Sequence, residues 1–384
     1  GGVGAEARSD GVGHVGRERA PVEVARESVG PGAERAQEER EERRVPDRDE
    51  REVAPGDEVA EMDEETWEKM LKVDLFGPFL CCRALIRARR AEGGGNIRSW
   101  AAWYDLDEQL AHMDGLGHRV DVVSSIGPFS VYFSELEPSH GRDEAMKWNE
   151  HMAGAQRAHP GRFWASAAIP LADTGVALEV LEHAVGTLGL MGVNLPGSIG
   201  SDPNIDAPRL EPFYARLAEL GVPAFLHPTD AVFADMLAGY GGALHLSLGR
   251  VIEVSVAASR LVLSGIMERH PGLKLVLSHT GGALPYQSGR MDKNTKNAKL
   301  PRPASTYLRR MYTDTVSPHS AGMRFAIEYY GIDNVMYGTD YPCWDPATCL
   351  ALLDELDLPE ADRTKLFRTN AIRILGLKGA VDAT

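Results

Sequence analysis

The feature that most constrains the fold is a regular alternation of apolar runs and amphipathic segments from about Trp100 to the C-terminus. Alternation of this kind is typical of parallel β-strands joined by crossover helices. Strands are expected at residues 119–124, 163–169, 191–195, 223–227, 274–278, 311–315 and 334–337. Helices are expected at residues 106–116, 143–158, 175–187, 210–220, 251–269, 306–310, 320–330, 346–355 and 360–375, with a further short helix near Leu284.

The number and spacing of these elements indicate a single large α/β domain. Seven strands over about 280 residues favour a TIM-like (β/α)8 barrel that lacks its first strand. A doubly wound parallel sheet is the architectural alternative. In such a barrel the reactive side chains lie at the carboxyl ends of the strands, so the residues that follow each strand are the candidates for a site.

The N-terminal part of the chain has a different composition from the barrel segment. Residues 1–60 contain no Leu, Ile, Phe, Tyr, Trp or Met, and they carry charged runs such as EEREERR at Glu38–Arg44. A segment of this kind buries too little apolar surface to offset the entropy cost of ordering it. We therefore predict a disordered tail over residues 1–60, a helical fragment over 61–99 and the barrel over 100–384.

The segment 62–97 is similar to a fragment of a known enzyme family. Its run VDLFGPFLC, Val73–Cys81, resembles part of one helix of the short-chain dehydrogenases, although Asp74 stands where that family usually has Asn. No Gly-rich dinucleotide loop precedes the run and no Tyr-x-x-x-Lys pair follows it. We expect no activity from this fragment alone, and a short-chain dehydrogenase is the least favoured function for the chain.

Charge and cysteine content exclude several classes of protein. A formal net charge of -15 argues against a nucleic-acid or anionic-membrane surface, which needs clustered positive charge. The four cysteines form no C-x-x-C pair, which fits a reduced compartment without a disulfide framework. No apolar run is long enough to span a bilayer, and no secretory signal is visible. We expect a cytoplasmic protein whose partner is a small molecule.

Three reactive side chains follow three of the expected strands. His227 ends the run GVPAFLH, His279 ends KLVLSH, and Asp340 comes shortly after NVMYG. A single histidine at a strand end is more often a structural residue, but three such groups in register are expected to meet on one face. Two neutral imidazoles and a carboxylate suit zinc or a similar divalent ion, so the sequence predicts a metal site.

These residues belong to motifs that resemble the amidohydrolase superfamily from about Trp103 to Leu377. The motifs are FLHP, IMERHPGLKLVLSHTGG, YQSGRMD, YGTDYP and FRTNAIRILGL. Within the superfamily the segment is most similar to metal-dependent decarboxylases related to aminocarboxymuconate-semialdehyde decarboxylase. The resemblance implies a barrel with a divalent metal, zinc or else manganese, that decarboxylates or hydrolyses an aromatic or unsaturated carboxylic acid.

The resemblance also implies roles for individual residues. His227 and Asp340 would be metal ligands, and His279 would act as acid/base or hold the activated water, which makes His279 and Asp340 the expected catalytic pair. Arg290, in YQSGRMD, stands where the family has an arginine that binds a substrate carboxylate, often in the neighbouring subunit of a homodimer.

Further candidates follow strands at the same end of the expected barrel. Asn194, His319 and Trp344 are expected to contact substrate, and a purely structural role is the alternative for each of them. Histidines on expected helices, such as His112, are expected to be solvated or to cap a helix.

The chain departs from the family pattern at one place. The family's first strand carries His-x-His, which supplies two further ligands, and this sequence contains no His-x-His. Catalytic zinc normally has three or more protein ligands. Two functions therefore stay open: a metal-dependent decarboxylase or hydrolase, and a non-catalytic barrel remnant that binds a ligand or partner without turnover.

Overall fold

The computed structural model describes residues 106–117, 121–123, 138–200, 202–229, 236–295, 300–341 and 343–377. The predicted disordered tail (1–60), the predicted dehydrogenase-like fragment (61–99) and the predicted loss of a first strand all lie outside these residues. The other predicted elements lie within them, apart from residues 119, 120 and 124 of the first predicted strand, and so does every predicted site residue.

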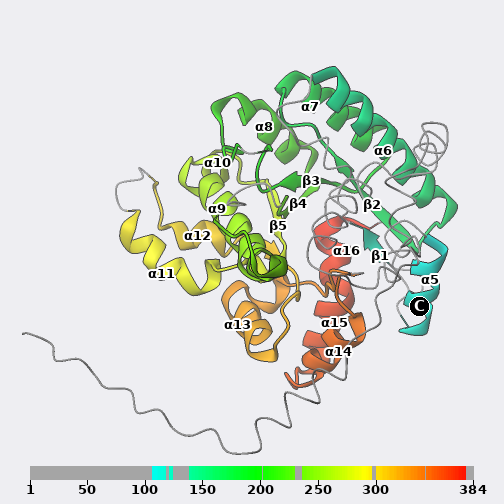
Figure 1. The fold of residues 1–384 in the computed structure, drawn as a ribbon, viewed down its shortest axis with the longest axis vertical. Coiled ribbons are helices and arrows are strands. Elements are labelled where there is room, and N and C mark those ends of the chain that lie inside the picture. The colour runs from blue at the N-terminus through cyan, green and yellow to red at the C-terminus, as the bar shows by residue number, and fades with distance from the viewer. Residues whose placement is uncertain are drawn as a thin grey trace, which may run out of the picture. The chain divides into compact units, whose positions relative to one another are not determined.

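Six parallel strands form the sheet of the described part. They are β1 (Asp121–Val123), β2 (Phe163–Ala168), β3 (Gly192–Pro196), β4 (Pro223–His227), β5 (Lys274–Leu277) and β6 (Tyr312–Thr313). Each strand pairs with the next one along the chain, in the order β1-β2-β3-β4-β5-β6. A doubly wound sheet reverses its strand order at a switch point, so this consecutive order excludes that alternative and fits the predicted barrel (Figure 1).

The last predicted strand, residues 334–337, is reduced to a single parallel bridge. Val335 pairs with Thr313 of β6 in the same parallel sense as the other strands. Two residues later the Tyr337 N–H donates to the Leu366 carbonyl at 2.8 Å. This N–H therefore bonds to a helical segment and does not extend the pairing with β6. The bridge still places this segment next to β6, in the expected order.

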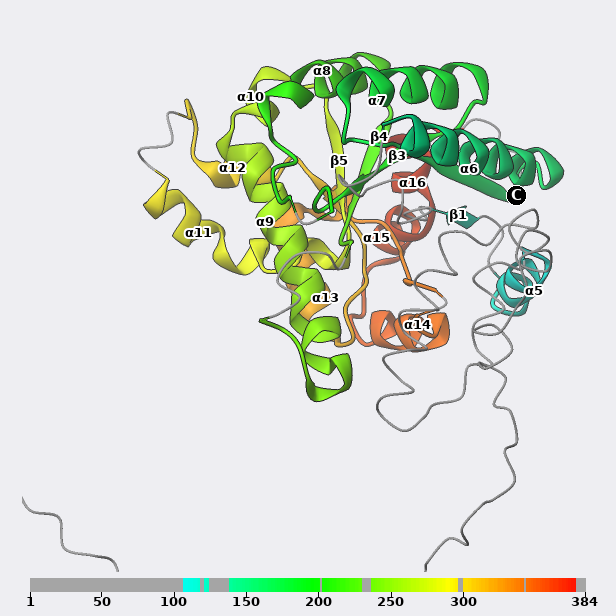
Figure 2. The ribbon, with the colours of Figure 1, turned by 45° about the horizontal axis from the view of Figure 1, so that its top comes forward.

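Most helices lie along the outside of the sheet, whereas α16 (Asn370–Leu375) lies at one end of the strands (Figures 1 and 2). They are α5 (Leu106–Gly115), α6 (Pro138–Ala158), α7 (Thr174–Leu181), α8 (Glu211–Leu220), α9 (Arg250–Leu263), α10 (Ile266–Arg269), α11 (Leu284–Asn294), α12 (Ala304–Leu308), α13 (Ser320–Tyr330), α14 (Pro346–Asp354), α15 (Glu360–Thr364) and α16 (Asn370–Leu375). The predicted helix 251–269 is split into α9 and α10 at Gly265, whose φ of 82° is left-handed and ends a helix without steric cost.

Alternate residues of the strands face two different hydrophobic clusters. Val193 and the residues that lie on the same side of the neighbouring strands pack against the helices in the main core. The intervening residues, such as Trp164 and Phe225, pack in a second cluster that contains Ile374 of α16. Lys274, the first residue of β5, donates to the Ile374 carbonyl at 3.4 Å, so α16 lies at the amino ends of the strands. The carboxyl ends are therefore the end at which a site can form.

Candidate metal centre

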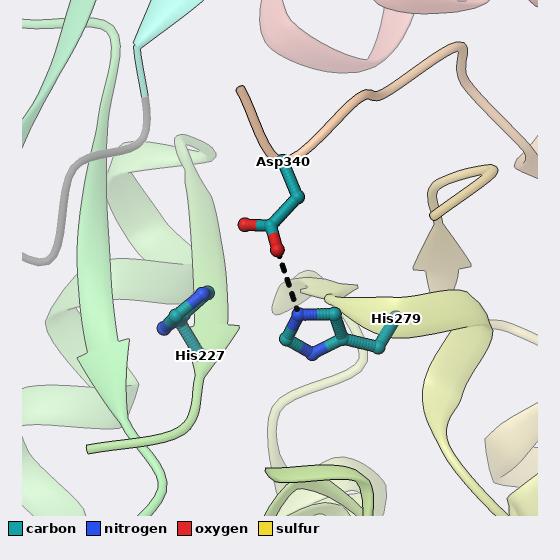
Figure 3. Close-up of side chains that lie close together, drawn as sticks. All are labelled: His227, His279 and Asp340. Atoms are coloured by element: carbon teal, nitrogen blue, oxygen red, sulfur yellow. Dashed lines mark ion pairs between the residues drawn. The ribbon is translucent and has the colours of Figure 1, made fainter. Parts of the chain in front are cut away.

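Three predicted site residues meet at the carboxyl end of the sheet. His227 is the last residue of β4, His279 follows β5 by two positions, and Asp340 lies beyond the bridged segment that follows β6. Figure 3 shows the three side chains converging on a common region. One ligand atom from each residue lies within 4.8 Å of the others, and the two imidazole centroids are 5.4 Å apart. This is the spacing that binding of one ion requires.

The His227 imidazole presents one ring nitrogen to this cluster. Its Nδ1 lies 2.8 Å from the Pro228 carbonyl oxygen. A carbonyl oxygen only accepts, so Nδ1 carries the proton and Nε2 carries the lone pair. Burial, together with the nearby His279, lowers the pKa of His227 to about 4, so the ring is neutral at physiological pH. A neutral imidazole with a bare Nε2 is the form that binds a divalent metal.

His279 and Asp340 form a largely buried ion pair. The His279 Nε2 lies 3.7 Å from the Asp340 Oδ2, which is too long for a hydrogen bond (Figure 3). Burial acts to lower the pKa of His279, but Asp340 outweighs it and the pKa is raised. Burial acts to raise the pKa of Asp340, but His279 outweighs it and the pKa is lowered. Each group therefore favours the charged form of the other.

Two atoms of this pair lack hydrogen-bond partners among the described residues. They are the His279 Nδ1 and the Asp340 Oδ2, and both are buried. An unsatisfied buried polar atom costs on the order of 1–3 kcal/mol, so the site is arranged for a group that the protein itself does not supply. Imidazole nitrogens and a carboxylate oxygen are donors that zinc and manganese accept, so the residues present fit a divalent metal.

Asp314, which no sequence motif singled out, fixes the turn that carries His279. Its carboxylate accepts the backbone N–H groups of His279, Thr280 and Val316 at 3.0, 2.9 and 3.0 Å. His279 and Thr280 have left-handed φ values of 56° and 54°, and Asp340 has a φ of 57°. Such values cost energy outside glycine and cluster at functional sites. The sequence feature that could have indicated Asp314 is its position, because it is an acidic residue at the end of an apolar strand.

Glu253 of α9 is a second carboxylate that no sequence motif singled out. Its side chain is 2% exposed, and its Oε1 accepts the Thr229 N–H and hydroxyl at 2.9 and 2.8 Å. Thr229 lies two residues after His227, so Glu253 holds the segment of chain that follows a candidate ligand. The sequence signal is a charged residue inside the apolar helical run VIEVSVAA, because a charge on a buried helix face requires partners.

Asn194, a predicted substrate contact, makes a bond within the sheet. It lies on β3, is 1% exposed, and its Oδ1 accepts the Ser166 hydroxyl of β2 at 2.8 Å. This bond satisfies a buried polar side chain between adjacent strands. Contact between Asn194 and substrate stays a prediction.

The other predicted substrate contacts lie nearer the surface. Arg290 is exposed on α11. His319 is the N-cap of α13, and its Nδ1 accepts the Gly322 N–H at 2.9 Å, which is a structural role. Trp344 is 44% exposed, and its backbone N–H donates to the Asp340 carbonyl at 3.2 Å. The structure thus places Trp344 beside a candidate ligand and leaves Arg290 directed outward.

The expectation that His112 is solvated or caps a helix is wrong. Its ring stacks on Tyr341 with centroids 4.6 Å apart and an interplanar angle of 9°. Tyr341 directly follows Asp340, so α5 packs against the loop that carries a candidate ligand. Spacing along a helix could not reveal this contact, because the two residues are far apart in the sequence.

Comparison with known proteins identifies the family. A family model described as Amidohydrolase matches residues 113–377. The chain belongs to the amidohydrolase family. This amidohydrolase is 32% identical over 289 residues to the gamma-resorcylate decarboxylase of Rhizobium sp., which covers 71% of this chain and 88% of the relative. It is 26% identical over 285 residues to the 2-amino-3-carboxymuconate-6-semialdehyde decarboxylase of Dictyostelium discoideum, with 71% and 77% covered.

A solved structure confirms the predicted barrel of this amidohydrolase. The dihydroxybenzoic acid decarboxylase of Polaromonas sp., solved with manganese and the inhibitor 2-nitroresorcinol, matches with a TM-score of 0.68 and 25% identity over 77% of this chain and 94% of that one. The family match begins at residue 113, and the comparisons do not support the dehydrogenase resemblance of residues 62–97. Among the described residues, no helix is both long and apolar enough to cross a membrane.

Proposed function

We propose that this amidohydrolase is a divalent-metal-dependent carboxy-lyase that removes carbon dioxide from an aromatic or unsaturated carboxylic acid without oxidation. The observation that carries the proposal is the convergence of His227, His279 and Asp340, whose ligand atoms lie within 4.8 Å of one another. The names of the relatives, which include gamma-resorcylate decarboxylase, favour decarboxylation over hydrolysis at this centre.

In this proposal His227 and Asp340 hold the metal through Nε2 and the carboxylate. A bound divalent ion would supply positive charge that polarises substrate oxygens. Zinc suits these donors, and manganese is the alternative because a related decarboxylase was solved with it. Water, substrate oxygens or residues outside the described part would complete the coordination.

The residues of the chain then have separate tasks. Arg290 pairs with the substrate carboxylate through its planar guanidinium, and its exposed position on α11 suits a homodimer in which it serves the neighbouring subunit. Cleavage of the carbon–carbon bond releases carbon dioxide and leaves an electron pair on the substrate carbon. His279 donates a proton to that carbon, a task that suits an imidazole whose pKa, despite burial, is raised by Asp340.

The remaining site residues are proposed to line the substrate position. Asn194 lies within β3, two residues before the strand ends, and His319 and Trp344 lie beyond the carboxyl end of β6, after which the chain reaches the metal cluster. The low cysteine content and the negative net charge support a cytoplasmic location with a small-molecule substrate.

The proposal is tested with the full chain loaded with zinc or with manganese. Carbon dioxide release from gamma-resorcylate is the assay, and bound metal is measured on the same samples. We expect His227→Ala and Asp340→Asn to lose both metal and turnover. We expect His279→Asn to retain the metal and lose turnover by roughly 10²–10⁴-fold, the usual contribution of a general acid. His183→Asn, a partly exposed histidine away from this end of the sheet, is the matched control and should keep both.

A second candidate is a non-catalytic barrel that binds a ligand or partner without turnover. The absence of a His-x-His motif from the sequence favours it, because two expected ligands are then missing. About one tightly held zinc or manganese per chain supports the enzyme. A chain that retains no metal after exposure to excess ion, and that releases no carbon dioxide, supports the non-catalytic barrel.

A further inference from the structure

The structure assigns a positioning role to Glu253: it fixes the peptide between Pro228 and Thr229 and thereby selects the tautomer of His227. The effect on the tautomer needs no metal. Its consequence for metal affinity rests on the proposed function.

Glu253 is enclosed with its hydrogen-bond donors. Glu253, Ser198 and Thr229 are 2%, 0% and 5% exposed. The Glu253 Oε1 accepts the Thr229 N–H at 2.9 Å and the Thr229 hydroxyl at 2.8 Å. The Ser198 hydroxyl lies 3.2 Å from that oxygen and 2.8 Å from the Thr229 hydroxyl, so its single proton goes to one of the two. Hydrogen bonds to a carboxyl group that is shielded from water are strong and directional.

The peptide between Pro228 and Thr229 transmits this constraint. A trans peptide is planar, and its N–H and C=O point in opposite directions. Here the Thr229 N–H points at Glu253, so the Pro228 carbonyl points the other way, toward the Nδ1 of His227 at 2.8 Å. Fixing one side of the plane fixes the other.

The orientation of that carbonyl decides which His227 nitrogen faces the site. A neutral imidazole can carry its proton on either nitrogen, and an acceptor beside Nδ1 holds the proton there. His227 contributes one ring nitrogen to the cluster with His279 and Asp340, and with the proton on Nδ1 we infer that Nε2 is the nitrogen that binds there. The hydrogen bond that the Thr229 N–H donates to Glu253 polarises the peptide and strengthens the carbonyl as an acceptor. The arrangement is a carboxylate–histidine pair with one peptide bond inserted, and it can tune a metal ligand in the same way.

Gly197 gives independent support, because it makes room for this carboxylate. A Cβ at Gly197 would lie 2.6 Å from the Glu253 Oε1 and 2.7 Å from its Cγ. The Gly197 N–H also donates to the His227 carbonyl at 2.9 Å, which continues the β3–β4 pairing. Gly197 therefore both holds the end of β4, which carries His227, and leaves the space that Glu253 occupies.

The first test reads the tautomer directly in the metal-free full chain. Nitrogen-15 NMR of histidine-labelled protein distinguishes protonated from bare ring nitrogens, and the signals lost in His227→Ala assign His227. We expect the Nδ1–H form to dominate in the parent and in Glu253→Gln, which keeps an oxygen acceptor. We expect the Nε2–H form to become at least equally populated in Glu253→Ala. An unchanged tautomer in Glu253→Ala would overturn the inference.

A second variant keeps the test decisive where Glu253→Ala does not fold. Glu253→Asp retains the charge but withdraws the carboxylate from the Thr229 N–H by one methylene, and we expect it also to populate the Nε2–H form. The parent tautomer in Glu253→Asp then overturns the inference. Asp292→Ala is the matched control, because Asp292 accepts the Ser305 N–H and hydroxyl at 2.8 and 2.6 Å in the same manner. It should leave the His227 tautomer unchanged.

The second test measures Co²⁺ affinity by visible absorption of the reconstituted chain. We expect Glu253→Ala to weaken Co²⁺ binding by about 10–100-fold, the usual effect of removing a partner of a ligand. Glu253→Gln keeps an oxygen acceptor for the Thr229 N–H and should bind Co²⁺ with nearly the affinity of the parent. An affinity of Glu253→Ala equal to that of the parent contradicts the inference. A parent chain that binds no Co²⁺ refutes the proposed metal site, while the tautomer measurement still decides the role of Glu253.

Discussion

The His279 Nε2 and the Asp340 Oδ2 lie 3.7 Å apart as a largely buried ion pair. The pKa of Asp340 is lowered, so its ionised carboxylate stabilises the fold at pH values above 3.8, the ordinary pKa of this group. The pKa of His279 is raised, so its protonated imidazole stabilises the fold at pH values below 6.5, the ordinary pKa of this group. The pair therefore contributes most between these two values. We predict that Asp340→Asn lowers the melting temperature of the metal-free protein by roughly 2–4 °C near pH 5.5 and by less near pH 8.5.

An exposed ion pair serves as the control for that measurement. Lys365 and Asp333 lie 2.9 Å apart at the surface, and Asp333→Asn should change the melting temperature equally at both pH values. A shift of the same size at both pH values for Asp340→Asn would show that the His279 pair does not stabilise the fold.

Removal of the Asp314 carboxylate should destabilise the turn that carries His279. It leaves three backbone N–H groups without their acceptor, two of them on residues with left-handed φ. We predict that Asp314→Ala lowers the free energy of unfolding by about 2–4 kcal/mol, measured by urea titration. Asp314→Asn keeps one oxygen acceptor and should lose about half as much. Equal stability of the parent and both variants would contradict this role.

Glu211 should make stability depend on pH in the acid range. Hydrogen bonds from Arg269 and His270 lower its pKa from an ordinary 4.5 to about 2. Its stabilising effect is therefore complete above pH 4.5 and is lost as the pH falls toward 2. We predict that Glu211→Gln costs about 1 kcal/mol at neutral pH, a value discounted for its partial exposure, and little near pH 2. Glu328→Gln, an exposed glutamate of α13, should show no such trend.

Two glycines should respond to alanine in opposite directions. Gly281 has a φ of 74°, and a Cβ there would lie 2.1 Å from the Tyr330 hydroxyl. Gly281→Ala should therefore lower the free energy of unfolding by about 2–4 kcal/mol. Gly289 lies within α11 with nothing near its Cβ position, so Gly289→Ala should stabilise the fold by about 0.5–1 kcal/mol. Thermal unfolding of both variants checks the pair, and a stable Gly281→Ala would refute the clash.

Arg290 should affect the use of a carboxylate substrate and not the fold. We predict that Arg290→Met lowers kcat/KM by roughly 10–100-fold, the equivalent of one charge-assisted contact, while the melting temperature stays unchanged. Lys293→Met, on the same helix, is the matched control for loss of an exposed positive charge. An equal decrease for both variants would indicate a general effect of charge on the rate of substrate encounter.

The order of elements and the candidate ligands could be predicted from the sequence because both depend on local pattern. Apolar strands between amphipathic helices imply parallel pairing, and parallel pairing brings the strand ends together. His227, His279 and Asp340 could therefore be grouped without coordinates. The strand at 334–337 was predicted too long, because its pairing stops where Tyr337 bonds to the Leu366 carbonyl, a contact that no local pattern contains.

The sequence by itself determined the barrel and the three groups that meet at its carboxyl end, since strand register and side-chain chemistry are properties of short segments. Only the tertiary structure decided how those groups are held. Glu253 reaches Thr229 across 24 residues, and Asp314 reaches His279 across 35. Which nitrogen of His227 is bare, and which backbone turn presents His279, depend on such distant contacts, because a hydrogen bond acts through space between atoms that only folding brings together.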